Sequence, residues 1–200
     1  MIGLLMTALL LATPVNASAE LFAVPFMGVK FGGSTSIVDL EFAADKTKFT
    51  LGGAIMNIDD GLLGYEASFG YVLGYFEGDA RESDPLVASG SFVVDGTASA
   101  IFTVPPRLTG YGLRPYAQAG AGLVHAQVVD NILHVFQVRR TMPVVTVGVG
   151  AVGLFTNNVG LRFDVRYFRS LSLTSDDGSL ATVGRRISFS RFTVGLFLRL

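Results

Sequence analysis

The stretch from Gly61 to Phe76, GLLGYEASFGYVLGYF, decides the fold that this sequence predicts. Its odd positions, from Leu63 to Tyr75, are all apolar or aromatic, whereas its even positions are mostly small or polar and include the carboxylate of Glu66. A period of two is typical of a β-strand because successive side chains leave opposite faces of the strand. The glycines within the stretch disfavour a helix of the same length.

The length of this stretch indicates where the strand lies. Strands of soluble proteins usually end after about 5–6 residues, while a strand tilted across a bilayer needs about 9–11. A long strand with one apolar face is the unit of a transmembrane β-barrel. We therefore expect an all-β fold in which the apolar face meets lipid.

Composition supports this prediction for the whole chain. Half of the 200 residues are hydrophobic and the mean hydropathy is +0.51. Beyond residue 20 no apolar run is long enough for a transmembrane helix, so a closed barrel is the remaining way to cross a membrane. The net charge of −1 gives no indication of nucleic-acid binding, and the absence of cysteine excludes disulfides and thiolate chemistry.

The N-terminus predicts a secretory signal. Residues 1–19 combine an apolar core with the cleavage pattern Ala17-Ser18-Ala19, which leaves residues 20–200 as one outer-membrane β-barrel domain. The first basic residue is Lys30, so the usual positive start is missing. The alternative is an apolar strand or helix that belongs to the mature protein.

Eight segments have strand patterns, which predicts an eight-stranded antiparallel barrel with up-and-down (meander) topology. Pro105 and Pro106 must interrupt the ladder, since proline cannot sit in a central strand, and 130–142 is a loop or a strand extension. The connections alternate in length, as they do between the two ends of outer-membrane barrels. The predicted strands are 24–33, 48–56, 61–76, 89–104, 114–128, 143–155, 159–170 and 187–200.

Charged side chains are predicted on the inward face of several strands. An eight-stranded barrel is just wide enough for side chains to fill it, so opposite charges should pair across the lumen and close it. The third and seventh strands lie opposite each other, which brings Glu66 within reach of Arg162 or Arg166. The alternative is a narrow polar path for ions. The predicted lumen charges are Lys30, Lys48, Glu66, Asp95, Arg162, Asp164, Arg166 and Arg199.

Other candidate sites are weaker. His125 and His134 are the two histidines, and neither shows the serine and acid that a hydrolase or acyltransferase would place beside it. The arginine pairs Arg139–Arg140 and Arg185–Arg186 are candidates for contacts with lipid phosphates, or else solvated loop residues. The loop acids Glu77, Asp79, Glu82 and Asp84 lack the ordered spacing of a calcium loop. We expect no metal, no cofactor and no catalysis.

The last residues, 193–200 (TVGLFLRL), resemble the terminal β-signal of outer-membrane proteins, with Thr193, Gly195, Leu198 and Leu200 at the matching positions. The segments VPFMGVKFGG, RPYAQAGAGL and GLRFDVRYF resemble strands of the outer-membrane β-barrel domain family, which includes the small OmpA- and OmpX-like barrels. The resemblance implies a bacterial outer-membrane location and recognition by the barrel assembly machinery and periplasmic chaperones. It also implies that outer-membrane lipid is the partner of the mature protein.

Tryptophan is absent, so tyrosine and phenylalanine would have to form the aromatic girdle at the membrane interfaces. The tyrosines predicted there are Tyr65, Tyr71, Tyr75, Tyr116 and Tyr167.

The function predicted from these features is structural or in surface interaction, for a monomer with a packed polar lumen. Three alternatives stay open: a lipid-modifying outer-membrane enzyme, a narrow pore, and a soluble lipocalin-like barrel with reversed faces. The outward or inward direction of Phe69, Val165 and Leu196 separates the last alternative from the others.

Overall fold

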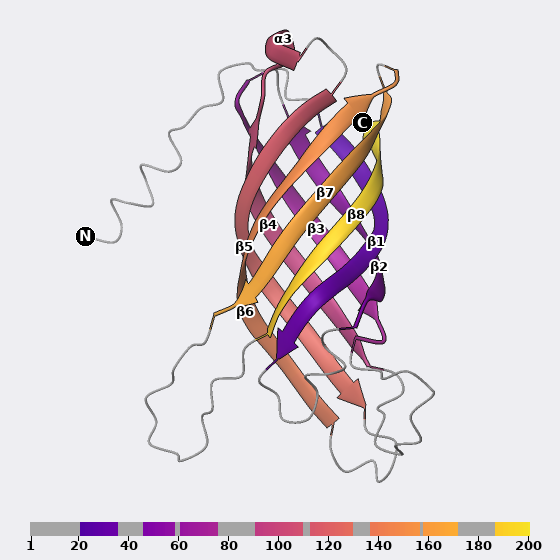
Figure 1. Cartoon of the computed structure of the whole chain (residues 1–200), viewed down its shortest axis with the longest axis vertical. Coiled ribbons are helices and arrows are strands. Elements are labelled where there is room, and N and C mark those ends of the chain that lie inside the picture. The colour runs from indigo at the N-terminus through magenta and orange to yellow at the C-terminus, as the bar shows by residue number, and fades with distance from the viewer. Residues whose placement is uncertain are drawn as a thin grey trace, which may run out of the picture.

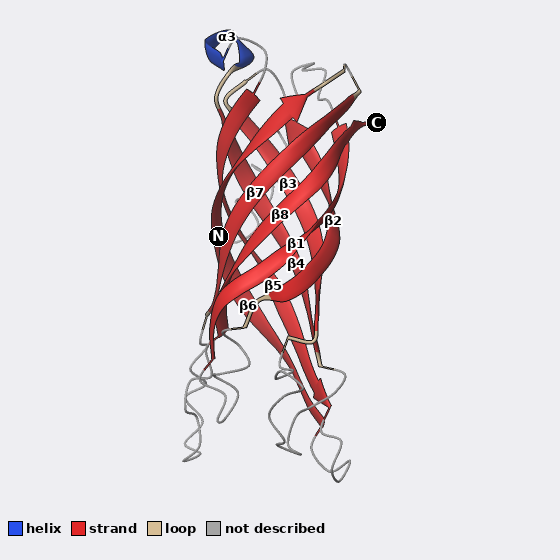
Figure 2. Cartoon of the chain, turned by 45° about the vertical axis from the view of Figure 1, so that its right-hand side comes forward, coloured by secondary structure: helices blue, strands red, loops and turns tan. Residues whose placement is uncertain are grey.

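Eight antiparallel strands form a single closed barrel in sequence order, as Figures 1 and 2 show. This computed structural model describes residues 21–35, 46–58, 61–75, 91–109, 113–129, 137–156, 158–171 and 187–200. The strands are β1 (Leu21–Thr35), β2 (Lys48–Ile58), β3 (Leu63–Leu73), β4 (Phe92–Thr103), β5 (Leu113–Val129), β6 (Gln137–Leu154), β7 (Val159–Ser170) and β8 (Ile187–Arg199), with a four-residue helix α3 (Pro106–Thr109) after β4. The predicted eight-stranded meander is confirmed.

The two ends of the barrel differ. We call the end with the short β2–β3, β4–β5 and β6–β7 connections the turn end, and the opposite end the loop end. Helix α3 and the C-terminus lie at the turn end (Figure 1). The candidate signal peptide, residues 1–19, falls outside the described residues. Among the described residues, no helix has the length and apolar character to cross a membrane.

The exterior is apolar, and the polar and charged side chains of the strands are enclosed in the interior together with apolar ones. Burial alternates along β3, β4 and β7, so that each strand places one row of side chains outside and one inside. Phe69, Val165 and Leu196 are exposed, which confirms their predicted outward direction. Because a lipocalin-type barrel needs apolar side chains inside and polar ones outside, this arrangement argues against that alternative.

Strand β6 begins earlier than predicted. Of the two alternatives predicted for residues 130–142, a strand extension is observed for Gln137 to Met142, which belong to β6 and pair with β5. Pairing of β6 with β7 starts only at Val144, and pairing of β5 with β4 stops at Gln127. The β5–β6 hairpin therefore extends past its neighbours at the loop end (Figure 1). An extension beyond the lipid needs no apolar face, so the period-two signal is lost there.

Barrel closure joins β1 to β8, and a bulge marks this seam. The register shifts between Phe31 and Ser34, and Gly32 has φ 57°, a conformation that glycine adopts without steric cost. Beyond the bulge, the hydroxyls of Ser34 and Ser188 lie 2.8 Å apart. The seam is thus paired to the end of β1.

Candidate functional site: the charged lumen

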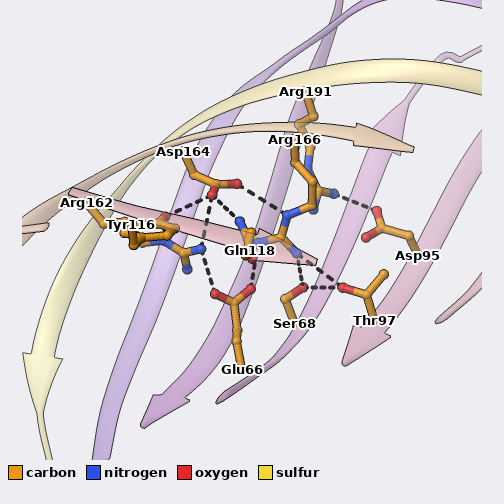
Figure 3. A network of polar contacts seen from close by, with 10 residues as sticks. All are labelled: Glu66, Ser68, Asp95, Thr97, Tyr116, Gln118, Arg162, Asp164, Arg166 and Arg191. Atoms are coloured by element: carbon orange, nitrogen blue, oxygen red, sulfur yellow. Dashed lines mark hydrogen bonds and ion pairs between the residues drawn. The ribbon is translucent and has the colours of Figure 1, made fainter. Parts of the chain in front are cut away.

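The interior of the barrel holds a network of ionised side chains contributed by strands on opposite walls (Figure 3). Three arginines and three carboxylates take part, so the formal charges balance. These residues are Arg162, Arg166, Arg191, Glu66, Asp95 and Asp164, and all are buried.

Glu66 of β3 lies between two arginines of β7. Its Oε2 is 2.6 Å from Arg162 Nη2, and its Oε1 accepts a hydrogen bond of 2.7 Å from Arg166 Nη2. The alternation of inward and outward side chains along β3 and β7, here called side-chain parity, predicted that these three side chains share the lumen. The structure brings them together. Charge-assisted contacts of this length are among the stronger hydrogen bonds in proteins.

Four side chains from the two strands β5 and β7 surround Asp164. Tyr116 donates to its Oδ2 at 2.8 Å, Gln118 Nε2 also donates to Oδ2, and Arg162 Nη2 donates at 3.3 Å. Arg166 Nε lies 3.4 Å from Oδ1. Arg162 also donates from Nε to the Tyr116 oxygen at 2.7 Å, so β5 and β7 are tied through the lumen. Saturation of this kind is what allows a carboxylate to stay buried.

Arg166 also reaches the opposite wall. Its Nη1 donates to Ser68 Oγ at 3.0 Å and to Thr97 Oγ1 at 3.2 Å, and these two hydroxyls are 2.7 Å apart. The arginine therefore connects β7 with both β3 and β4. A planar group with five donors suits such a role better than a lysine would.

A separate ion pair joins β8 and β4. Arg191 Nη1 lies 2.6 Å from Asp95 Oδ2, and the guanidinium carbon sits 4.6 Å from the Phe168 ring centroid and 5.3 Å from that of Phe26. Asp95 was a predicted lumen residue, but Arg191 was missed. The alternation along β8 could have identified Arg191, because its neighbour Phe192 faces outward and Arg191 must then face inward.

Glycines on the inward face make room for these large side chains. A Cβ atom at Gly70 would overlap both Arg191 and Asp95, and one at Gly150 would overlap the Tyr116 ring. A Cβ at Gly148 would come within 3.3 Å of Gln118 Nε2. The small residues seen in the sequence therefore allow a narrow barrel to enclose arginines.

An apolar layer lies on each side of the charged network. The loop-end layer comprises Val72, Tyr75, Val93, Val124, Ala126, Val144, Phe168, Ile187 and Phe189. The turn-end layer comprises Phe22, Val24, Phe26, Ala54, Met56, Ile58, Ile101, Tyr116, Val152 and Phe197. The Phe22 and Phe197 rings stack at 3.9 Å, as do those of Phe168 and Phe189 at 4.6 Å.

Three predicted lumen charges lie apart from this network. Lys30 is fully buried, donates to the Lys46 carbonyl at 3.0 Å, and lies 4.4 Å above the Tyr75 ring in the loop-end layer. Lys48 is only half-buried. Arg199 is exposed where β8 ends, so its predicted place in the lumen is wrong. Side-chain parity was correct for Arg199, but a strand end has no facing wall to cover it.

The tyrosine girdle is also partly wrong. Tyr75 and Tyr116 are buried in the lumen layers, while Tyr65 and Tyr167 are exposed on the outer surface and Tyr71 is half-buried there. Tyr71 stacks with Phe92 at 5.4 Å. Tyr116 occupies an even position of β5, on the face that also carries Gln118. Its phenol is needed inside as a partner of Arg162 and Asp164, which sequence alone did not indicate.

The remaining candidates lie elsewhere. In β8, Thr193 and Gly195 face inward, Leu198 is half-buried and Leu200 is exposed. The backbones of Arg139 and Arg140 belong to β6. Arg185, Arg186, His134 and the loop acids Glu77, Asp79, Glu82 and Asp84 fall outside the described residues.

His125 lies on the outer face near the loop end of β5. Its Nδ1 is 2.9 Å from Thr141 Oγ1, its cross-strand partner on β6. A threonine hydroxyl is therefore its neighbour, rather than the serine that the enzyme alternative requires. Within the described ranges, no three His, Cys, Asp or Glu residues group as metal ligands do.

A closed meander with an apolar exterior and an ionised interior defines the outer-membrane class of β-barrel. The chain is similar to the crystal structure of Neisserial surface protein A, with a TM-score of 0.62, 16% identity, and coverage of 90% of this chain and 97% of that chain. It is also similar to Ail of Yersinia pestis, solved in complex with the heparin analogue sucrose octasulfate, with a TM-score of 0.51, 13% identity, and coverage of 90% and 99%.

The N-terminal β-barrel domain of Pseudomonas aeruginosa OprF matches with a TM-score of 0.45 at 20% identity, covering 88% of this chain and 97% of that chain. No protein-family model and no curated protein sequence matches the chain. The likeness to Neisserial surface protein A and to Ail concerns the fold, and at that level the predicted resemblance to small eight-stranded outer-membrane barrels is confirmed.

Proposed function

We propose that this chain is a monomeric, integral outer-membrane β-barrel with a closed lumen and a structural or surface-interaction role. The observation that carries the proposal is the inversion of polarity, with ion pairs inside and exposed Phe69, Val147 and Val165 outside. Such an exterior is unstable in water and suited to acyl chains. Outer-membrane lipid is its main partner, and the tail residues 193–200 serve as its assembly signal.

The arrangement of the lumen supports closure rather than conduction. The charges are matched in number and joined by contacts of 2.6–3.4 Å, and an apolar layer lies toward each mouth. Ions would have to cross both apolar layers as well as displace the paired arginines. Burial of an unpaired ion costs several kcal/mol, which makes this route unfavourable.

The β5–β6 hairpin supports a surface-interaction role. It continues past β4 and β7 at the loop end, which faces outward in this orientation, so residues Gln137 to Met142 extend from the membrane. The second candidate function is enzymatic, a lipid-modifying role for His125. The feature that favours it is the position of His125 on the outer face, with its Nδ1 beside the Thr141 hydroxyl.

Refolding into detergent or phospholipid vesicles tests the proposal. We expect β-structure and heat-modifiable gel migration only when detergent or lipid is present, and no ion conductance across a planar bilayer. Folding to the same β-structure in plain buffer would overturn the membrane assignment. Stepwise conductance would overturn the closed lumen. Release of fatty acid or transfer of an acyl chain, lost in His125→Ala, would establish the enzymatic alternative.

A further inference from the structure

The turn end of the barrel exposes large apolar side chains on all three of its short connections. Leu62 before β3 is 62% exposed, Leu108 in α3 is 78% exposed, and Phe155 after β6 is 71% exposed. These residues lie outside the strands, in connections that would ordinarily be polar in water. Figure 2 shows one of these connections, helix α3, beyond the end of the barrel.

The loop end differs on its outer surface. Outward positions there include the polar side chains Ser34, Thr141 and Arg169 on three strands and Thr47 just before β2, all of them exposed, beside the exposed Leu73 and Leu171. Polar side chains therefore interrupt the apolar exterior at the loop end, whereas the apolar exterior continues to the turns at the other end. This asymmetry fixes where one boundary of the lipid lies.

The thickness of the bilayer then places the other boundary. The apolar band of an outer-membrane barrel is about 25 Å tall, and a strand tilted by about 40° gains roughly 2.5 Å of depth per residue. About ten residues therefore cross it. On β5 the outward apolar side chains run from Leu123 to Leu113, and from β6 into the turn that follows it they run from Val145 to Phe155, which is ten residue steps in each case.

The band therefore ends at the turns themselves and leaves no polar collar between them and the lipid. We propose that the turn end is seated in the periplasmic lipid interface, with Leu62, Leu108 and Phe155 inserted as anchors. The inference rests on the proposed membrane function. The occupant of this surface is lipid because the exposed side chains continue the lipid-facing belt without a break.

Charge at the same level agrees with a lipid partner. Arg199 is exposed at the end of β8, and its backbone N donates to the Asn158 carbonyl in the β6–β7 turn beside Phe155. An exposed cation beside an inserted apolar side chain matches a phosphate headgroup above its acyl chains. The turn end thus presents both parts of a lipid-interface contact.

Tryptophan substitution tests the placement directly, because the chain contains no tryptophan and each variant reports a single site. The variants are Leu108→Trp and Phe155→Trp at the turn end, Val147→Trp in the belt and Thr47→Trp at the loop end. Each is folded into phospholipid vesicles in which the acyl chains carry bromine at a shallow or a deep position. Excitation is chosen so that tyrosine does not contribute.

We expect shallow bromine to quench the tryptophans at positions 108 and 155 more than deep bromine does. The extent of this quenching should be at least about half of that seen at position 147. The belt control should be quenched most by deep bromine, and the loop-end control should stay nearly unquenched.

If position 147 is quenched while positions 108 and 155 behave like position 47, the anchor is refuted and the membrane assignment stands. If position 147 is also unquenched, the membrane assignment itself fails.

Since tryptophan favours interfaces, a second measurement omits it. The triple variant Leu62→Ser, Leu108→Ser, Phe155→Ser should fold into vesicles at least about threefold more slowly than the parent, and an unchanged rate would count against the anchor.

Discussion

Neutralising Glu66 is the sharpest test of the lumen network. In Glu66→Gln the side chain keeps its size and one carbonyl oxygen, but Arg162 and Arg166 lose the carboxylate that they share at 2.6 and 2.7 Å. The network then holds three arginines against the two carboxylates Asp95 and Asp164, all shielded from water. The variant therefore removes charge while leaving shape almost unchanged.

The expected loss follows from that excess charge. Removing one partner from a buried ion pair typically destabilises a protein by about 3–5 kcal/mol, because the remaining charge is left uncompensated. Asp164 still contacts both arginines, at 3.3 and 3.4 Å, which keeps the expected loss from exceeding this range. We therefore expect Glu66→Gln to lower the free energy of unfolding by about 3–5 kcal/mol.

The assay is urea unfolding of the barrel from phospholipid vesicles, followed by circular dichroism and by heat-modifiable gel migration. The matched control is Arg169→Gln, which also removes one unit of charge but from an exposed position on β7. A surface change of this kind should alter the free energy of unfolding by no more than about 0.5 kcal/mol.

A double variant separates charge from packing. Adding Arg162→Met to Glu66→Gln restores the balance between arginines and carboxylates, while Asp164 keeps Tyr116, Gln118 and Arg166 as partners. We expect the double variant to be at least about 1 kcal/mol more stable than Glu66→Gln alone. The reasoning is refuted if Glu66→Gln matches the parent within about 0.5 kcal/mol, or if the two substitutions destabilise additively.

Three further predictions concern other parts of the barrel. Gly52→Ala should destabilise by more than about 1 kcal/mol, because its Cβ would overlap the Phe69 carbonyl, whereas the neighbouring Gly53→Ala has room and should be near neutral; urea unfolding compares them. Val149→Arg, in the outer belt, should lower the free energy of unfolding from vesicles by about 2–4 kcal/mol, whereas Thr47→Arg at the loop end should lower it by no more than about 1 kcal/mol. Equal losses for the two variants would contradict the lipid boundary. Phe189→Ala, in the loop-end layer, should cost about 3–5 kcal/mol through the cavity it leaves.

Much of the architecture was predictable from the sequence because a strand repeats every two residues. Alternation across Gly61 to Phe76 and along the seventh segment predicted which faces point outward, and the structure confirms this direction for Phe69 and Val165. The same parity predicted that Glu66, Arg162 and Arg166 point into one lumen. The number of strands followed from counting such segments between turn residues.

Parity could not predict how far along the barrel each side chain lies. Arg199 and Arg162 both have inward parity, yet Arg199 is exposed at a strand end and Arg162 is enclosed at the centre. Whether Arg191 meets Asp95, or Tyr116 meets Asp164, depends on the tilt and stagger with which eight strands close.

The alternation of residues along each strand therefore determined the two faces of this protein. Only closure of the barrel decided which charges became partners and which aromatic rings closed over them, because the axial level of each residue is set by all eight registers together.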